Sequence, residues 1–308
     1  MATQNVISRV FFVPSSVFGL FTLGDWLSPS LSNIEMLLSM RMGLMALLLA
    51  VVAPRLYRNT FGAIGQLRQT PRLLRYVVGS GVCLFVGLTA LYLSLSQVAA
   101  GIAIATFFIY PAVTVLLAWR FLQQPPQRYQ LALMLFILFG VVLTTLGSAA
   151  AATPAANPML GVSSGLIAGL NFGLYGIFAE IALQSHPTRS DLHPVPFSLI
   201  TFIIVSVLAA FSLFLMPPIE VAPTDWRAIS LMTLLSASVT VIAYVLNNSG
   251  IRLIGASLTA LISASAPALT ALFAWVALQE ALQFQQILGI GVVTLGVAAL
   301  SLKAKEPK

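Results

Sequence analysis

Long apolar runs separated by short polar connections recur along the whole chain. Each run spans about 18 to 25 residues without strict polar–apolar alternation, so each can cross about 30 Å of hydrocarbon as a helix. The first run contains Pro14, Ser15 and Ser16 and could also be a secretory signal, but no small-residue cleavage site follows it, so a retained helix is expected. The runs predict ten transmembrane helices, at residues 8–25, 34–54, 76–96, 98–120, 128–148, 159–182, 195–216, 227–250, 255–278 and 283–303.

One pattern occurs twice, at a spacing of 156 residues. The segment Tyr110-Pro-Ala-Val-Thr-Val-Leu-Leu-Ala-Trp119 returns as Ala266-Pro-Ala-Leu-Thr-Ala-Leu-Phe-Ala-Trp275. The spacing predicts a duplicated unit of five helices, and five crossings are an odd number, so the second unit enters the membrane from the opposite face. The predicted units are residues 1–148 and 159–303, followed by a cytoplasmic tail at 304–308.

The composition indicates which solvent surrounds these helices. Hydrophobic residues make up 59% of the chain and charged residues only 7%, as in proteins whose helices face lipid. The predicted fold class is an all-α polytopic membrane protein with ten transmembrane helices arranged as two inverted five-helix repeats. Such short connections leave no room for a separate soluble domain.

Basic residues fall almost entirely on one side of the predicted helices. When the N-terminus is placed inside, only Arg227 lies in an outer loop, and Arg41 lies within the second helix. This bias predicts cytoplasmic N- and C-termini in a bacterial plasma (inner) membrane. It also explains the formal charge of +7, so the basic connection is interpreted as a lipid anchor and not as a nucleic-acid surface. The inner basic residues are Arg9, Arg55, Arg58, Arg68, Arg72, Arg75, Arg120, Arg128, Arg189, Arg252, Lys303, Lys305 and Lys308.

Several motifs are similar to those of a known family. The second unit has Pro267 in mid-helix, then Ala274-Trp275 and Leu278-Gln279-Glu280, before a glycine-rich last helix; the first unit has the same layout with Gln124 in place of the glutamate. These features resemble the EamA-type domain of the drug/metabolite transporter superfamily over nearly the whole chain. The resemblance implies a central cavity lined mainly by helices 1, 3, 4, 6, 8 and 9, with helices 5 and 10 more peripheral. It also implies export of small metabolites such as amino acids.

Two prolines lie near the middle of equivalent helices. Pro111 and Pro267 each free the carbonyl four residues back, on Phe107 and Ser263, and each favours a kink. A bend at the same point of both units suits a gating element, and a static kink tolerated by its neighbours is the alternative.

Polar side chains at helical spacing indicate where a solute could bind. In residues 227–250 a polar residue recurs every four positions, from Ser236 through Thr240 to Asn248, and such a stripe is expected to face the interior of the bundle. A lone Ser or Thr is more often contact between helices, whereas Tyr and Asn need larger polar partners. The predicted substrate-binding residues are Tyr92, Tyr110, Asn171, Tyr175, Tyr244, Asn247, Asn248 and Arg41.

Arg41 is the most costly residue to place in the membrane. A guanidinium near mid-membrane costs up to about 3 kcal/mol, so pairing or function must compensate. Two interpretations remain open: a structural one, as an ion pair with Glu35 or Asp25 or as a packing residue of the family, and a functional one, as attraction of a carboxylate or other anionic group at the outer vestibule. Separately, Gly161, Gly165, Gly169 and Gly173 predict a close helix crossing within the chain, with a homodimer interface as the alternative.

What the sequence lacks narrows the function. No carboxylate falls near the middle of a predicted helix, so uniport or exchange is expected rather than carboxylate-coupled symport. Neither histidine lies in a predicted helix, Cys83 is the one cysteine, and no metal-ligand spacing occurs, so no cofactor, no metal and no enzymatic activity are expected. The predicted function is transport of a small neutral or zwitterionic metabolite such as an amino acid, by alternating access between the repeats. The alternatives are a receptor or scaffold and an intramembrane enzyme.

Overall fold

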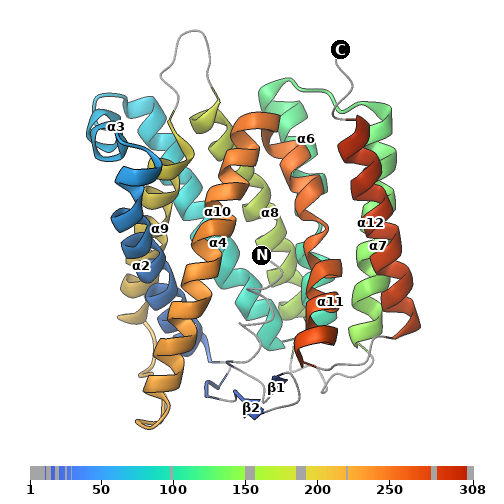
Figure 1. Ribbon diagram of the computed structural model, residues 1–308, viewed down its shortest axis with the longest axis horizontal. Helices are drawn as coiled ribbons and strands as arrows, with labels where there is room; N and C mark the ends of the chain where they lie inside the picture. The colour runs from blue at the N-terminus through green and yellow to red at the C-terminus, as the bar shows by residue number, and fades with distance from the viewer. Residues whose placement is uncertain are drawn as a thin grey trace.

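The computed structural model describes residues 11, 15–17, 21–24, 26–28, 30–97, 100–149, 157–184, 192–219, 221–278 and 283–303. These residues form a bundle of helices and one short hairpin (Figure 1). The helices are α2 (Leu31–Leu56), α3 (Thr60–Leu67), α4 (Pro71–Gln97), α5 (Ala100–Phe107), α6 (Tyr110–Leu122), α7 (Arg128–Ala149), α8 (Pro158–Leu183), α9 (Pro194–Leu213), α10 (Trp226–Ser263), α11 (Ala266–Leu278) and α12 (Phe284–Lys303).

The helices occupy the second to the tenth apolar runs. Among the described residues, five are long and apolar enough to cross a membrane alone, namely α2, α4, α8, α9 and α10, while α6, α7 and α12 contain shorter apolar helices. Side-chain caps fix two of these starts, since Ser30 accepts from the Asn33 amide at 3.3 Å and Asn157 accepts from the Leu160 amide at 3.1 Å.

The helix predicted at 8–25 is not present in the described part of that run. Residues Ser15–Val17 (β1) and Phe21–Leu23 (β2) instead pair as antiparallel strands, with Val17 opposite Phe21. The sequence offers a physical reason, because Pro14 cannot continue a helical hydrogen-bond ladder and Ser15 and Ser16 favour local bonds to the backbone. The prediction of a first transmembrane helix is therefore wrong for these residues.

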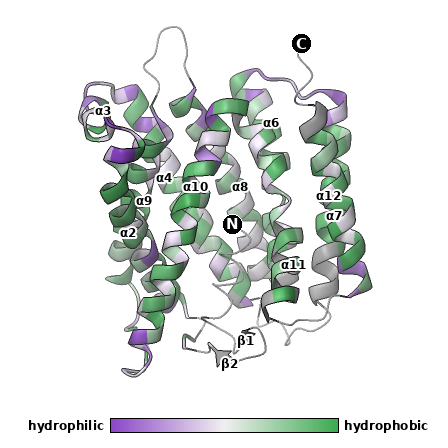
Figure 2. Cartoon of the chain, in the orientation of Figure 1, coloured by the Kyte–Doolittle hydropathy of each residue, from purple (hydrophilic) through white to green (hydrophobic). Residues whose placement is uncertain are grey.

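Hydrophilic residues gather towards the ends of the helices, and apolar residues cover their middle parts (Figure 2). In Figure 1 the end of α2, the start of α4 and the connection from α6 to α7 all lie at the top, with α3 beside them. These segments carry Arg55, Arg75, Arg120 and Arg128. The structure thus places sequence-distant basic segments at one end of the bundle, while the hairpin and the start of α10 lie at the other end.

Helices α7 and α12 form a tightly packed pair at the edge of the bundle (Figure 1). A Cβ added to Gly140 of α7 would lie 2.8 Å from Val293, and one added to Gly296 of α12 would lie 2.6 Å from Ile137. Both contacts are closer than real Cβ atoms tolerate, so glycine is needed at both positions. The pair matches the peripheral fifth and tenth helices that the resemblance implied.

The element boundaries recur at the spacing of 156 residues. Advanced by that number, α5 (100–107) becomes 256–263, the last part of α10, and α6 (110–122) becomes 266–278, which is α11. Likewise α7 begins at Arg128 and α12 at Phe284. The duplicated sequence pattern is therefore accompanied by a duplicated order of helices and breaks.

Candidate functional site

Two helix breaks precede the paired prolines. The first separates α5 from α6 at Phe108 and Ile109, just before Pro111, and the second separates α10 from α11 at Ala264 and Ser265, just before Pro267. A proline has no N–H to donate and its ring crowds the preceding turn, so each helix restarts at this point. A turn interrupts the helix at both points, although Ile109 and Ala264 keep helical φ and ψ values, and a gating role for Pro111 and Pro267 stays a prediction.

A third break, which the sequence analysis missed, lies at Gly255 within α10. Its φ of 82° and ψ of 164° are far from helical values. This region of backbone space is open to glycine and almost closed to other residues. The internal duplication could have revealed this break. Residues 256–263 repeat α5, so a helix start is expected at residue 256, and the residue before a helix start, here Gly255, lies outside the helix.

The side chain of Glu180 holds the break at Gly255. Its Oε2 accepts a hydrogen bond of 2.6 Å from the backbone N–H of Ala256, and its Oε1 accepts one of 2.8 Å from Nε2 of Gln124, just beyond α6. An anion at a helix N-terminus is stabilised by the free N–H groups and the helix dipole. Glu180 therefore connects α8, α6 and the restarted part of α10 at one point.

Glu180 lies near the end of the helix predicted at 159–182 and is not among the predicted site residues. In the structure it is 2% exposed, and its position in the sequence Phe-Ala-Glu-Ile-Ala shows a single acid inside an apolar run. Glu35, near the start of α2, is likewise buried, and Thr89 donates to its Oε1 at 2.6 Å. Both acids lie near a helix end, in agreement with the absence of a carboxylate near the middle of a helix, but their burial was not predicted.

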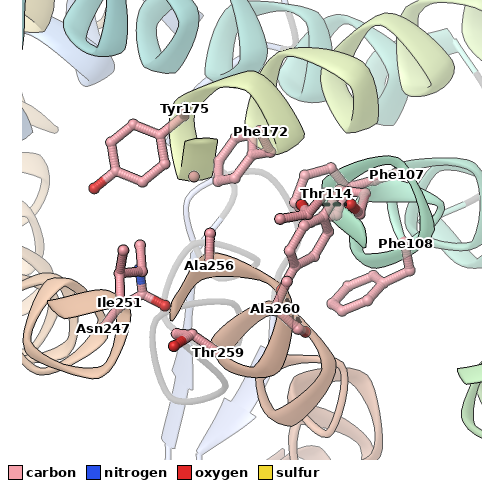
Figure 3. Close-up of a pocket in the computed structure, with 12 residues that line it drawn as sticks. Phe107, Phe108, Thr114, Phe172, Tyr175, Asn247, Ile251, Ala256, Thr259 and Ala260 are labelled. Atoms are coloured by element: carbon pink, nitrogen blue, oxygen red, sulfur yellow. Dashed lines mark hydrogen bonds between the residues drawn. The ribbon is translucent and has the colours of Figure 1, made fainter. Parts of the chain in front are cut away.

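A cavity lies between the helix breaks. Figure 3 shows Phe172 and Tyr175 approaching it from α8, Phe107, Phe108 and Thr114 from the α5–α6 break, and Asn247, Ile251, Ala256, Thr259 and Ala260 from α10. Its volume is about 40 Å³, which is room for a few water molecules. None of the described residues that line it carries a formal charge. The lining combines aromatic rings with a few hydroxyl and amide groups.

Tyr175 and Asn248 form a hydrogen-bonded bridge beside this cavity. The Tyr175 hydroxyl donates to Oδ1 of Asn248 at 2.7 Å, and Nδ2 of Asn248 donates to the Ser198 hydroxyl at 2.8 Å. All three side chains are buried, and together they tie α8, α10 and α9. Two residues of the predicted stripes are thus brought into direct contact.

Other predicted residues fall into two groups. Tyr110 lines the cavity and its hydroxyl donates to the Ala260 carbonyl at 3.5 Å, while Asn247 lines it and accepts from Ser263 at 3.3 Å. Asn171 does not reach the cavity, because its amide donates to the Ile167 carbonyl of its own helix at 2.9 Å.

A second group of predicted residues lies outside this cavity, between α2, α4 and α10, and consists of Arg41, Tyr92 and Tyr244. The guanidinium carbon of Arg41 lies 5.6 Å from the centre of the Tyr92 ring, and Tyr244 lies within electrostatic range of the guanidinium. Arg41 is 1% exposed, and within the described residues none of its three nitrogens has a hydrogen-bond partner. The predicted ion pair with Glu35 is therefore not formed, and Asp25 lies outside the described residues.

The glycine stripe of α8 packs against the α5–α6 break. A Cβ on Gly165 would collide with the Thr106 side chain, one on Gly169 would lie 2.8 Å from the Phe107 carbonyl oxygen, and one on Gly173 would lie 2.7 Å from Val113. The predicted close crossing within the chain is confirmed for these three glycines. It brings α8 close to the carbonyl that Pro111 leaves free.

Comparisons with known proteins agree with this geometry. The model of the EamA-like transporter family matches the chain twice, at residues 10–146 and 159–302. An uncharacterized transporter from Synechocystis sp. (strain ATCC 27184 / PCC 6803 / Kazusa) is 37% identical over 306 residues, covering 99% of this chain and 90% of the relative. A crystal structure with 15% identity matches with a TM-score of 0.65 over 99% of this chain and 94% of that one, which supports the fold alone.

Proposed function

The chain belongs to the EamA-like transporter family, and from this premise we propose that it moves a small neutral or zwitterionic metabolite, such as an amino acid, across the membrane. The route is the cavity between the helix breaks. Transport follows alternating access between two inverted repeats, with export or facilitated diffusion as its direction. The protein acts as a transporter and not as an enzyme.

One observation carries this proposal, namely that the α5–α6 break and the break at Gly255 border one uncharged cavity. Broken helices at equivalent points of two repeats leave unpaired backbone groups beside a site and allow each half-helix to move separately. At about 40 Å³ the cavity is smaller than a typical metabolite site of at least about 300 Å³. A bound solute therefore requires the α5–α6 and α10–α11 segments to separate, which is the motion that alternating access needs.

The recurrence of helix boundaries supports the inverted repeat. The family model also matches once in each half, on either side of residues 147–158. Two inverted copies run in opposite directions, so that opening one side closes the other. We propose that Pro111 and Pro267 mark the two equivalent points about which these segments bend.

The lining of the cavity supports the substrate class. Tyr110, Tyr175 and Asn247 supply hydroxyl and amide groups, and Phe107 and Phe172 supply apolar faces. A highly charged solute such as a phosphate ester would lose its hydration here with no charged side chain to replace it. A neutral or zwitterionic solute needs only the hydrogen bonds that these groups offer.

The sequence bias of basic residues leads us to propose that both termini lie in the cytoplasm, and in the structure the C-terminal end of α12 lies at the basic end of the bundle (Figure 1). The basic ends of α2, α4, α6 and α7 lie at one end of the bundle (Figure 1), and this end faces the cytoplasm of a bacterial inner membrane under the positive-inside rule. Fusions after Gly147 and after Lys308 should report the outside and the inside, respectively. Reports from one compartment for both would contradict the inverted repeat.

Solute flux in proteoliposomes tests the function. Purified protein should exchange at least one small amino acid or related metabolite down its gradient, without a proton or sodium gradient. Asn247→Ala should raise the apparent KM about fivefold, as expected for a lost hydrogen bond of about 1 kcal/mol. Ser238→Ala is the matched control, because Ser238 lies on the same helix but bonds the Leu234 carbonyl of that helix.

Two outcomes would contradict parts of this proposal. Absence of flux for every solute would favour a receptor or scaffold function over transport. Accumulation of solute that collapses with an ionophore would contradict uniport or exchange.

A further inference from the structure

Arg41 is a buried cation without a counter-charge in the described part of the chain. It stands ten residues into α2, about 15 Å along the helix axis from Leu31, and its side chain is 1% exposed. Its Nε, Nη1 and Nη2 atoms are all buried and have no hydrogen-bond partner within the described residues. A folded protein retains such a group at a large cost unless something else supplies its partner.

Neither of the two buried carboxylates among the described residues bonds Arg41. Glu35 lies on the same helix, where its Oε1 accepts from Thr89 and its buried Oε2 has no hydrogen-bond partner within the described residues, and Glu180 accepts from Gln124 and from the Ala256 amide. Tyr92 places its ring 5.6 Å from the guanidinium carbon, and a ring face stabilises a cation without neutralising it. The five N–H donors of Arg41 therefore have no anionic partner among the described residues.

A row of buried hydroxyls extends along α10, the helix that packs against α2. Ser236 and Thr240 are fully buried, and their oxygens have no hydrogen-bond partner among the described residues. Tyr244 follows one turn later and is close enough to Arg41 for an electrostatic interaction. One turn further, Asn248 bonds Tyr175, which lines the cavity. Arg41 and the cavity are thus joined by a single polar face of α10.

We propose that Arg41 binds the carboxylate of the transported solute, with Ser236 and Thr240 as additional donors. A carboxylate supplies the missing negative charge and two oxygens that match the guanidinium fork, so it can accept two parallel hydrogen bonds. The remainder of the molecule then extends along the polar face of α10 towards the cavity. This inference rests on the proposed transport function and narrows its substrates to amino acids and other small monocarboxylates.

Binding to the detergent-purified wild-type protein tests the inference without any mutation. Each of the twenty proteinogenic L-amino acids, together with small 2-hydroxy and 2-oxo monocarboxylic acids, is compared with its own amide by thermal unfolding. A ligand that binds only the folded state raises the Tm in proportion to its concentration relative to Kd. We expect at least one acid to raise the Tm, and its amide to need at least tenfold more ligand for the same shift.

Two variants then assign the effect to Arg41. Arg41→Gln should abolish the preference for the acid over the amide, and Arg41→Lys should retain charge but weaken acid binding about tenfold, because an ammonium lacks the bidentate fork. Ser238→Ala should leave the preference unchanged. Equal shifts by acid and amide in the wild type, no shift by any carboxylate, a stronger shift by inorganic phosphate, or a preference retained in Arg41→Gln would each overturn the inference.

Flux separates this inference from the proposed function. An acid that stabilises the wild type but does not cross proteoliposome membranes would contradict transport and leave the carboxylate site intact. Flux in which acid and amide have the same KM, in the wild type and in Arg41→Gln, would contradict the carboxylate site and leave transport intact.

Discussion

Glu180 and Arg41 are two charges buried to nearly the same extent, 2% and 1% exposed, in opposite circumstances. The carboxylate accepts hydrogen bonds from Gln124 and from the Ala256 amide, whereas the guanidinium has no hydrogen-bond partner in the described residues. A satisfied buried charge holds structure together, because its desolvation is offset within the protein. A buried charge without a partner in the protein is available to a ligand of opposite charge. The contrast therefore distinguishes a structural contact from a ligand-binding site.

The same contrast extends to the neighbours of each charge. Around Glu180 the chain adopts a backbone that only glycine allows, so the position of the break is fixed. Around Arg41 the hydroxyls of Ser236 and Thr240 are also unpartnered within the described residues. Stability should therefore depend on the first region and solute recognition on the second.

The largest expected effect is on the Glu180 side. Glu180→Ala removes two charge-assisted hydrogen bonds and leaves the Ala256 amide buried without an acceptor, which should lower the free energy of unfolding by about 3 kcal/mol. Glu180→Gln keeps the shape and one acceptor, so about half of that loss is expected. Unfolding in mixed micelles with increasing SDS measures both. Wild-type stability in Glu180→Ala would remove the structural role assigned to this carboxylate.

Gly255→Ala tests the backbone that Glu180 holds. A Cβ at φ 82° is strained, and it would also lie 3.3 Å from Oε1 of Glu180, so a loss of about 2 kcal/mol is expected. Gly291→Ala is the matched control, since an added Cβ there meets nothing within 4 Å and alanine favours a helix. The same SDS titration applies to both, and equal effects would mean that the conformation at Gly255 is not a requirement.

Arg41→Met should have the opposite sign. Replacing an unpaired buried charge with an apolar side chain of similar length removes a desolvation cost, so the free energy of unfolding should rise by about 1 to 2 kcal/mol in the absence of solute. Acid-dependent transport should be lost in the same variant. A drop in stability similar to that of Glu180→Ala would indicate that Arg41 has a structural partner, and the contrast between the two charges would fail.

Tyr175→Phe should have the smallest effect. It removes one hydroxyl that donates to Asn248, while Asn248 keeps its bond to Ser198, so about 1 kcal/mol of stability or a fivefold change in apparent affinity is expected. Tyr76→Phe in α4 provides a comparison for general loss of a tyrosine hydroxyl. Solute-dependent flux measures affinity, and a change larger than in Asn247→Ala would place Tyr175 in direct contact with the solute.

The amino-acid pattern alone determined the elements that depend on local physics. Apolar runs of membrane length predicted where the helices between α2 and α12 lie, with the exception of the short α3, because every backbone group in hydrocarbon must pair within its own segment. Pro111 and Pro267 each predicted a kink, since a missing N–H acts wherever the chain folds. The glycine spacing in α8 predicted a close helix crossing, because a helix face without side chains lets another backbone approach closely.

Only the tertiary structure decided what depends on distant partners. The run at 8–25 was long and apolar, yet the pairing of Val17 with Phe21 prevailed over its helical length. Glu180 became structural because Gln124 and Ala256, remote in sequence, converge on it, whereas Arg41 has no hydrogen-bond partner among the described residues although Glu35 lies on its own helix. Residue type and spacing fix what a side chain can bind, but which partner reaches it is decided by the packing of helices that the sequence places far apart.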